Sequence, residues 1–263
     1  MMTLVSTARF FSARARRGAW AAGVALGVSA LAGCGGVGGG TDAARIRAVN
    51  VAVNADQANI LVNGASANGD QKAFTPTAVS GYLYLAGNKT STFSWTTAVT
   101  LPAGASPPAG PSLYLSNNQY YTAFLLGRTD VNVRSTNYTG VTDPRFLQVV
   151  VTSDSHPAPA SGNASVRVVD AAPDAGPVDV LVNGKPLSSD YTGLSYKVPV
   201  TTLLPAPYVD VPAGTLSVQV NVSGAATPVV AATSVPVSAG KSYTLVVTEP
   251  STTPTYGLQT IPD

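Results

Sequence analysis

The sequence predicts an all-β protein built from two similar β-sandwich domains in tandem. Three observations support this fold class. Charged residues make up 11% of the 263 residues and glutamate occurs once, at Glu249, so few segments could form amphipathic helices. No stretch after Thr41 shows helical periodicity, whereas several segments alternate polar and apolar residues. The third observation is an internal repeat that spans most of the chain.

The chain begins with an export segment. Residues 1–18 carry basic side chains and no acid, and residues 19–30 form an apolar run of 12 residues. A run of this length is too short to span a bilayer, which needs about 20 residues. A basic start followed by a short apolar run is typical of a signal peptide, so we expect residues 1–33 to be removed. The basic residues are Arg9, Arg14, Arg16 and Arg17.

The apolar run ends at a segment that resembles the lipobox of bacterial lipoproteins. Leu31-Ala32-Gly33-Cys34 has a branched apolar residue, two small residues and a cysteine. The resemblance implies cleavage before Cys34, a diacylglyceryl group on its thiol and an acyl chain on the new amine. More than one acyl chain gives stable anchoring, because each buried CH₂ contributes about 0.8 kcal/mol. We therefore predict lipidation at Cys34, with membrane lipid as a partner and the bacterial cell envelope as the location.

The residues after Cys34 refine this prediction. Gly35 stands where an Asp would resemble an inner-membrane retention signal, so the outer membrane is favoured if the host is Gram-negative. The Gly-rich residues 34–44 are expected to act as a flexible tether. Without residues 1–33, 11 basic residues remain against 13 acids, and the net charge falls from +2 to −2. This balance excludes a basic surface for nucleic acid.

The internal repeat is clearest between residues 46–64 and residues 166–184. They read IRAVNVAVNADQANILVNG and VRVVDAAPDAGPVDVLVNG, and they align without a gap at an offset of 120. Further along, LYLSNNQYYTAFLL of the first copy resembles SVPVSAGKSYTLVV of the second. The identical pairs are Arg47/Arg167, Val49/Val169, Ala52/Ala172, Ala55/Ala175, Leu61/Leu181, Val62/Val182, Asn63/Asn183 and Gly64/Gly184.

These similarities divide the chain. We expect one β-sandwich over residues 45–152 and a second over residues 165–263, each close to the ~100 residues of an immunoglobulin-like domain. Residues 153–164 are rich in Pro, Ser and Gly and are expected to form a linker. About seven short antiparallel strands are predicted in each copy.

Alternation predicts which side chains face each core. In residues 215–222, the residues expected to face the core are Leu216, Val218, Val220 and Val222, and those expected to face water are Thr215, Ser217, Gln219 and Asn221. The corresponding strand of the first copy places Phe93 and Trp95 inward. Hairpin turns of type I′ are expected at Asn63-Gly64 and Asn183-Gly184, and edges or turns at Pro102, Pro199, Pro212 and Pro236.

The repeated pattern resembles a bacterial envelope domain catalogued as domain of unknown function 4397. The second copy carries it in VRVVDAAPDAGPVDVLVNG, VPAGTLSVQV and VSAGKSYTLVV, and the first copy is more diverged. The resemblance implies tandem immunoglobulin-like sandwiches on secreted or lipid-anchored proteins. It supplies no catalytic residue.

Three aspartates of the second copy, Asp170, Asp174 and Asp179, form an acidic turn region. Oxygen ligands of this kind could bind calcium, but their spacing does not match an EF-hand loop. We expect them to satisfy backbone groups in turns, with calcium binding left open. A hydrolase that uses Asp170 or Asp174 is a further alternative. The first copy has Asn50, Asn54 and Asn59 at these positions.

Other chemistry finds little support in the sequence. With one Cys and one His, the chain offers no internal disulfide and no zinc ligand set, so we expect no metal and no cofactor. His156 falls in the predicted linker, where a solvated side chain is expected. No P-loop, dinucleotide fingerprint or GxSxG motif is present, and we do not expect an enzyme.

The first copy carries an excess of aromatic residues. Some are expected in the core, and Tyr82, Tyr84 or Tyr120 is expected to point outward. The whole set is Tyr82, Tyr84, Phe93, Trp95, Tyr114, Tyr120, Tyr121 and Phe124. The sequence thus favours a non-catalytic structural, adhesive or binding module with envelope proteins or glycans as partners. The alternative is a carbohydrate-recognition module that uses the exposed aromatics.

Overall fold

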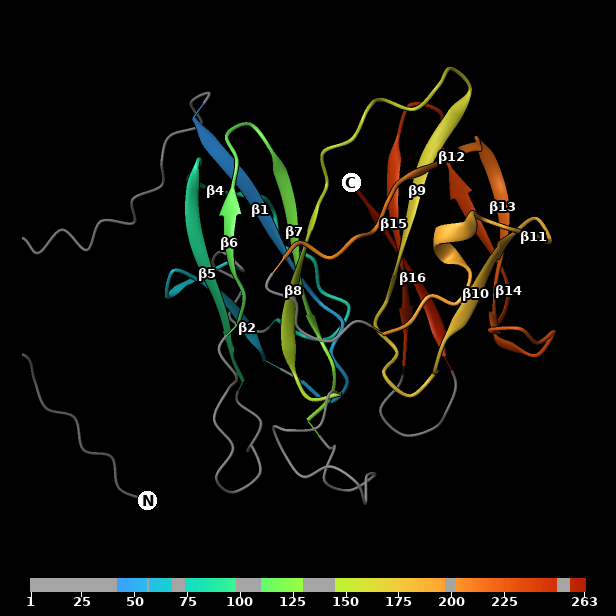
Figure 1. Cartoon of the computed structure of the whole chain (residues 1–263), viewed down its shortest axis with the longest axis horizontal. Helices are drawn as coiled ribbons and strands as arrows, with labels where there is room; N and C mark the ends of the chain where they lie inside the picture. Colours follow the sequence, from blue (N-terminus) through green and yellow to red (C-terminus); the bar gives the residue numbers. More distant parts are fainter. Residues whose placement is uncertain are drawn as a thin grey trace, which may run out of the picture. The chain divides into compact units, whose positions relative to one another are not determined.

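The computed structural model describes residues 42–55, 57–67, 74–97, 110–129, 145–196, 202–249 and 256–263. These residues form two β-sandwiches and one 3₁₀ turn at Ser189–Tyr191 (Figure 1). Within them, no helix is long and apolar enough to cross a membrane. Cys34, the signal segment, Pro102 and Pro199 lie outside the described residues.

The first repeat is a sandwich of two sheets. One sheet has the strand order β4-β1-β7-β8 and the other β3-β2-β5-β6. The core between them contains Ile46, Phe93 and Trp95. The strands are β1 (Ala43–Asn50), β2 (Asn59–Val62), β3 (Ala65–Ser66), β4 (Leu83–Ala86), β5 (Lys89–Thr96), β6 (Ser112–Leu115), β7 (Tyr120–Leu126) and β8 (Gln148–Ser153).

The second repeat has the same topology. Its sheets are β12-β9-β15-β16 and β11-β10-β13-β14. The all-β tandem fold predicted from the sequence is thereby confirmed. The strands are β9 (Asn163–Asp170), β10 (Val178–Val182), β11 (Lys185–Pro186), β12 (Val209–Pro212), β13 (Gly214–Val222), β14 (Pro228–Val237), β15 (Ser242–Thr248) and β16 (Gly257–Pro262).

The sheets differ from the prediction in two respects, because the described part of each repeat has eight strands in place of about seven and the pairing is not purely antiparallel. The described residues form eight strands in each repeat, and β1 pairs in parallel with β7, as β9 does with β15. Between β1 and β7 the chain crosses to the other sheet to form β2, β3, β5 and β6. A crossover of this kind lets the returning strand run in the same direction as its neighbour.

The Asn-Gly hairpins form as predicted. Asn63 and Asn183 have φ angles of 52° and 51°, and the following glycines, Gly64 and Gly184, have φ angles of 81° and 76°. Positive φ at both central residues is the signature of the type I′ turn. Each asparagine also accepts a backbone hydrogen bond from the neighbouring strand, at 2.9 Å from Thr92 N–H or from Ser217 N–H. The turn is therefore attached to the strand beside it.

The predicted alternation holds over most of β13. Leu216, Val218 and Val220 are buried, as are Phe93 and Trp95 in β5. The prediction is wrong at the end of the strand, where Val222 is 37% exposed and Asn221 is buried. Val222 is the last residue of β13, and the Asn221 side chain accepts a hydrogen bond from the Gln219 amide at 2.6 Å.

The prolines of the described region stand where the sequence predicts them. Pro212 is the last residue of β12, and Pro236 lies in β14. Both strands are at the edges of their sheets, where a residue without a backbone N–H is tolerated.

The two repeats pack together through one sheet of each. Residues 36–263 form one compact unit, and an apolar cluster with members from both repeats lies between β4-β1-β7-β8 and β12-β9-β15-β16. Leu204 of the second repeat also donates its N–H to Val151 O of β8, at 2.8 Å. The buried members of the cluster are Val49, Val51, Phe124, Leu126, Val150, Val169, Ala171, Leu204, Val246 and Ile261.

Candidate functional site

A buried polar cluster lies between the two repeats beside this apolar contact. It is centred on Arg47 of β1 and Arg167 of β9, which occupy the same position in the two copies and are 4% and 0% exposed. Alternation explains their direction. Ile46 and Ala48 face the core of the first sandwich, so Arg47 between them faces the second repeat.

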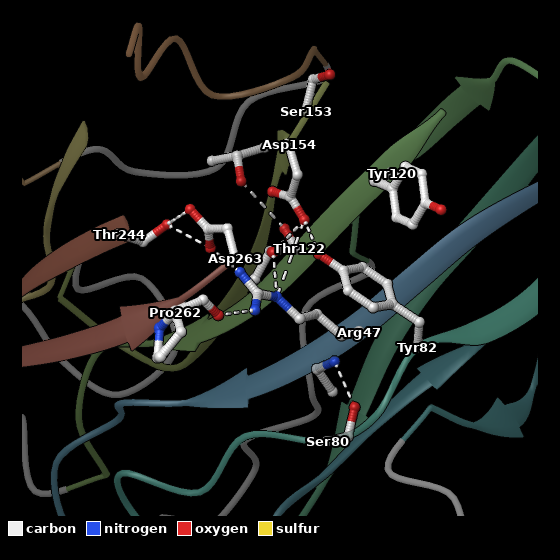
Figure 2. A network of polar contacts seen from close by, with 12 residues as sticks. Arg47, Ser80, Tyr82, Tyr120, Thr122, Ser153, Asp154, Thr244, Pro262 and Asp263 are labelled. Carbon is white, nitrogen blue, oxygen red and sulfur yellow. Dashed lines mark hydrogen bonds and ion pairs between the residues drawn. The ribbon is translucent and has the colours of Figure 1, made fainter. Parts of the chain in front are cut away.

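In the first repeat, Arg47 is held by a chain of hydrogen bonds (Figure 2). Its Nε donates to Thr122 Oγ1 at 2.8 Å, and Thr122 Oγ1 donates to Asp154 Oδ2 at 2.7 Å. Tyr82 also donates its hydroxyl to Asp154 Oδ2, at 2.8 Å. These residues come from β1, β7, the loop before β4 and the residue after β8. We call Arg47, Tyr82, Thr122 and Asp154 the first quartet.

The second repeat builds the same arrangement. Arg167 Nε donates to Thr244 Oγ1 at 2.8 Å, and Thr244 Oγ1 lies 3.0 and 2.9 Å from the two carboxylate oxygens of Asp263. The Tyr208 hydroxyl donates to Asp263 Oδ2 at 2.6 Å. Arg167, Tyr208, Thr244 and Asp263 are the second quartet.

Each arginine also donates hydrogen bonds to the other repeat. Arg47 donates through Nη1 to Pro262 O at 2.7 Å and through Nη2 to Asp263 Oδ1. Arg167 donates through Nη1 to Ser153 O at 2.7 Å and through Nη2 to Asp154 Oδ1 at 2.5 Å. Each arginine thus joins the threonine of its own repeat to the aspartate of the other. Such reciprocity is the property of an isologous, two-fold interface between subunits, here within one chain.

The charges of the quartets balance, since two guanidinium groups face two carboxylates. Burial alone favours the neutral form of Arg167, but the carboxylates of Asp154 and Asp263 hold its pKa above the ordinary value. Burial, and then the neighbouring carboxylates, raise the pKa of the Tyr82 and Tyr208 hydroxyls. Both tyrosines therefore remain hydrogen-bond donors, and the arrangement is suited to holding the repeats together.

A cleft of about 380 Å³ opens next to the quartets. It is lined by residues of both repeats and of the predicted linker: Tyr82, Tyr120, Asp154, His156, Ser242 and Asp263. The prediction of a solvated linker histidine is wrong. The His156 ring is partly buried and stacks on Tyr208, with 3.8 Å between ring centroids and 26° between planes.

Beside the cleft, the first repeat carries a row of aromatic side chains around a cation. On the sheet, Arg45 of β1 pairs with Tyr84 of β4 on one side and with Tyr120 of β7 on the other. Its guanidinium carbon lies 5.4 Å from the Tyr84 ring centroid and 4.8 Å from that of Tyr120. The Tyr82 ring meets Tyr120 edge to face at 5.2 Å. We call Arg45, Tyr84 and Tyr120 the platform.

The outward tyrosines of the prediction are thus partly confirmed. Tyr84 and Tyr120 are 42% and 39% exposed, whereas Tyr82 is partly buried against Asp154. The most exposed of the aromatic set is Tyr114, at 59%, on β6 of the opposite sheet. The remaining members, Phe93, Trp95, Tyr121 and Phe124, are buried.

The three aspartates of the acidic region do not converge. Asp170 Oδ1 accepts a hydrogen bond from Ala172 N–H at 3.0 Å, as Asn50 Oδ1 does from Ala52 N–H at 3.1 Å. Asp179 accepts from Gly193 N–H at 2.7 Å and Gly224 N–H at 3.0 Å, and these bonds lower its pKa. Both fit the predicted role in turns. Within the described part of the chain, no group of three or more His, Cys, Asp or Glu gathers as a metal site.

Asp174 differs from this expectation, because it pairs with arginines of the first repeat. Arg128, which is 0% exposed, donates to Asp174 at 2.5 Å and to Glu249 at 2.7 Å, and Arg145 donates to Asp174 at 2.7 Å. Burial raises the pKa of Glu249, and Arg128 opposes this shift. These ion pairs form a second polar link between the repeats, apart from the cleft.

Sequence reasoning did not single out the quartets, although a signal existed. Arg47 and Arg167 are identical in the two copies and stand in otherwise apolar strands. The structure matches Thr122 of the first repeat with Thr244 of the second. The similarity between residues 113–126 and 234–247 is one residue out of register at this point, since it places Thr122 against Tyr243. The same shift matches Tyr121 with Tyr243, whose hydroxyls accept from the backbone five residues earlier.

Comparison with known proteins gives one family and no curated relative. No curated protein matches the chain. The sequence model of the family described as domain of unknown function (DUF4397) matches residues 44–181 and 164–263, so its two matches overlap and together cover both repeats. The chain therefore belongs to the DUF4397 family, of which it carries tandem copies.

Proposed function

We propose that this protein is a lipid-anchored component of the bacterial cell envelope whose two repeats act as one non-catalytic binding or structural module. The anchor rests on one observation, the resemblance of residues 31–34 to a lipobox that ends at Cys34, the single cysteine of the chain. The proposal of one module is supported by the reciprocal contacts of Arg47 and Arg167, because these buried charges pair with each other's repeat and so join the two repeats. The outer membrane is the proposed location in a Gram-negative host.

Replacing the lipidated cysteine tests the anchor. The Cys34→Ser variant should lose incorporation of radiolabelled palmitate and move from the membrane to the soluble fraction, because no thiol remains to receive the diacylglyceryl group. Gly35→Ala is the matched control and should stay in the membrane, since it alters the neighbouring residue and leaves the lipobox intact. Membrane retention of Cys34→Ser would show that the anchor assignment is wrong.

Carbohydrate recognition is the second candidate function. The observation that favours it is the position of Tyr84 and Tyr120, which are exposed on either side of Arg45, and Tyr120 also lines the cleft. Aromatic faces of this kind pack well against the apolar faces of sugar rings. Binding to a glycan should weaken in Tyr84→Ala and Tyr120→Ala and persist in Tyr114→Ala, which removes an exposed tyrosine from the opposite sheet.

A hydrolase based on Asp170 or Asp174 has less support. Asp174 is occupied by Arg128 and Arg145, and Asp170 is buried. Neither lines the cleft beside the quartets. These contacts support the proposal that the module is non-catalytic.

A further inference from the structure

The platform contains one cation, Arg45, between two aromatic rings. Among the described residues, the Arg45 guanidinium contacts the rings of Tyr84 and Tyr120 and has no carboxylate partner. The quartets next to it are neutral as a group, since Arg47 and Arg167 offset Asp154 and Asp263. One positive charge is therefore left at a partly exposed position beside the cleft.

We propose that the platform and the cleft bind an acidic glycan, with a uronic-acid carboxylate on Arg45 and sugar rings against Tyr84 and Tyr120. This inference rests on the carbohydrate-recognition candidate and names its ligand class. A guanidinium offers a planar pair of donors that matches a carboxylate, and its contacts with both flanking rings hold it between them. The exposed parts of the Tyr84 and Tyr120 rings supply the apolar contact that a sugar ring needs.

The cleft extends the platform toward the second repeat. Its volume of about 380 Å³ falls at the lower end of the range for ligand sites, about 300–1,000 Å³, and suits one or two sugar rings. Ser242 and His156 add polar groups to its wall. Two carboxylates, those of Asp154 and Asp263, line the cleft, and each already accepts hydrogen bonds from an arginine, a tyrosine and a threonine, so they present little uncompensated charge to an acidic ligand.

The second repeat has different chemistry at the equivalent place. The residues that correspond to Arg45, Tyr84 and Tyr120 are Ser165, Asp210 and Ser242, and the Ser165 hydroxyl donates to Asp210 Oδ1 at 2.7 Å. A cation between two aromatic rings thus occurs once in the two described sandwiches. We therefore expect one site per chain.

Calorimetric titration of the full-length chain in mild detergent tests this proposal. The probes are tetragalacturonate and its methyl ester, which keep the same sugar rings and differ in charge. We expect one site for the acid, weaker binding of the ester, and weaker binding of the acid at high salt, because salt screens exposed charges. Arg45→Gln should weaken binding about tenfold or more, and Tyr84→Ala or Tyr120→Ala should also weaken it.

Matched controls separate the site from the general surface. Lys89→Gln removes an exposed cation and Tyr114→Ala an exposed tyrosine from the opposite sheet, and both should bind as the unaltered chain does. Thermal unfolding should change little in Arg45→Gln, because the variant removes two partly exposed cation–π contacts and breaks no ion pair among the described residues.

Each contrary result has a distinct meaning. Equal binding of acid and ester, or unchanged binding by Arg45→Gln, would overturn the acidic ligand and leave carbohydrate recognition standing. No binding to oligosaccharides of galacturonate, alginate or hyaluronan would overturn the acidic ligand, and no binding to a panel of neutral glycans as well would overturn carbohydrate recognition. Crosslinking of an envelope protein to the platform without any glycan binding would assign the surface to a protein partner and also reject the proposal.

Discussion

Asp170 and Asn50 show how one side chain can substitute for another at the same place in two repeats. Asn50 donates from Nδ2 to the carbonyl oxygens of Ala55 and Phe74, at 3.1 and 2.8 Å. Asp170 Oδ2 is buried and has no hydrogen-bond partner within the described residues. Burial raises the pKa of Asp170 to about 7, so its folded state favours the neutral acid.

The Asp170→Asn variant should therefore be more stable than the unaltered chain above neutral pH. With a folded pKa of about 7 and an unfolded value of 3.8, Asp170 binds its proton more tightly in the folded state. Its contribution to stability is then present at low pH and is lost as the pH rises toward 7. We expect a gain of about 1–3 kcal/mol at pH 8, and little gain at pH 4, in denaturant unfolding.

Asp179→Asn is the control for this experiment, because its pKa is shifted in the other direction. Hydrogen bonds from Gly224 and Gly193 lower the pKa of Asp179, so its charged form stabilises the fold above the unfolded pKa. That variant should lose stability at neutral pH. A pH-independent effect of Asp170→Asn would contradict the assignment.

At the scale of an element, the Asn-Gly hairpins combine two functions. The turn residue Asn183 adopts a φ of 51°, and its Oδ1 accepts the Ser217 N–H of the neighbouring strand at 2.9 Å. We expect Asn183→Ala to cost about 1–3 kcal/mol in free energy of unfolding, since alanine neither accepts this bond nor tolerates positive φ well. Asn183→Asp keeps the acceptor and should cost less. Equal losses in the two variants would show that the side-chain bond contributes nothing.

Local patterns predicted these elements where one side of a strand faces water. Alternation identified Leu216, Val218 and Val220 in β13, and the dipeptide Asn183-Gly184 identified its turn. Alternation gives no such signal for β1, whose eight residues are almost all buried. The outer face of β1 is covered by the other repeat, and no local pattern states which of two similar sheets will be covered.

At the scale of the whole molecule, the quartets should make the two sandwiches unfold together. After removal of residues 1–33, Trp95 is the one tryptophan and reports on the first repeat, whereas far-ultraviolet circular dichroism reports on both. The two denaturation curves should coincide in the unaltered chain. They should separate in the double variant Arg47→Met and Arg167→Met, because each loss leaves a buried carboxylate without its partner.

The single variant Arg47→Met should lose about 3–5 kcal/mol, the usual cost of an uncompensated buried charge. Adding Asp263→Asn should restore part of this loss, since the stranded carboxylate is then neutral. Coincident curves in the double arginine variant would show that the contacts outside the quartets, namely the apolar cluster and the Arg128 ion pairs, are enough to couple the repeats.

The contacts of the quartets between the repeats could not be predicted from the sequence. Arg47 and Asp263 are 216 residues apart, and their pairing depends on two complete sandwiches meeting face to face. The platform needed three neighbouring strands in register before Arg45 lay between Tyr84 and Tyr120. The candidate tyrosines were visible in the sequence, but the cation between them was not.

The reciprocal arginine contacts have a consequence for how such a surface can change. If the same interface joined two identical chains, every substitution would occur on both sides of the symmetry axis, and a second Arg45 would stand opposite the first. Fusion of the two halves removes this constraint. One half can keep the shared quartet while it acquires Arg45, Tyr84 and Tyr120, and the other can keep Ser165, Asp210 and Ser242. A duplicated chain thus keeps the two-fold contact of a dimer. It can also carry a binding surface on one repeat alone, which a homodimer cannot do.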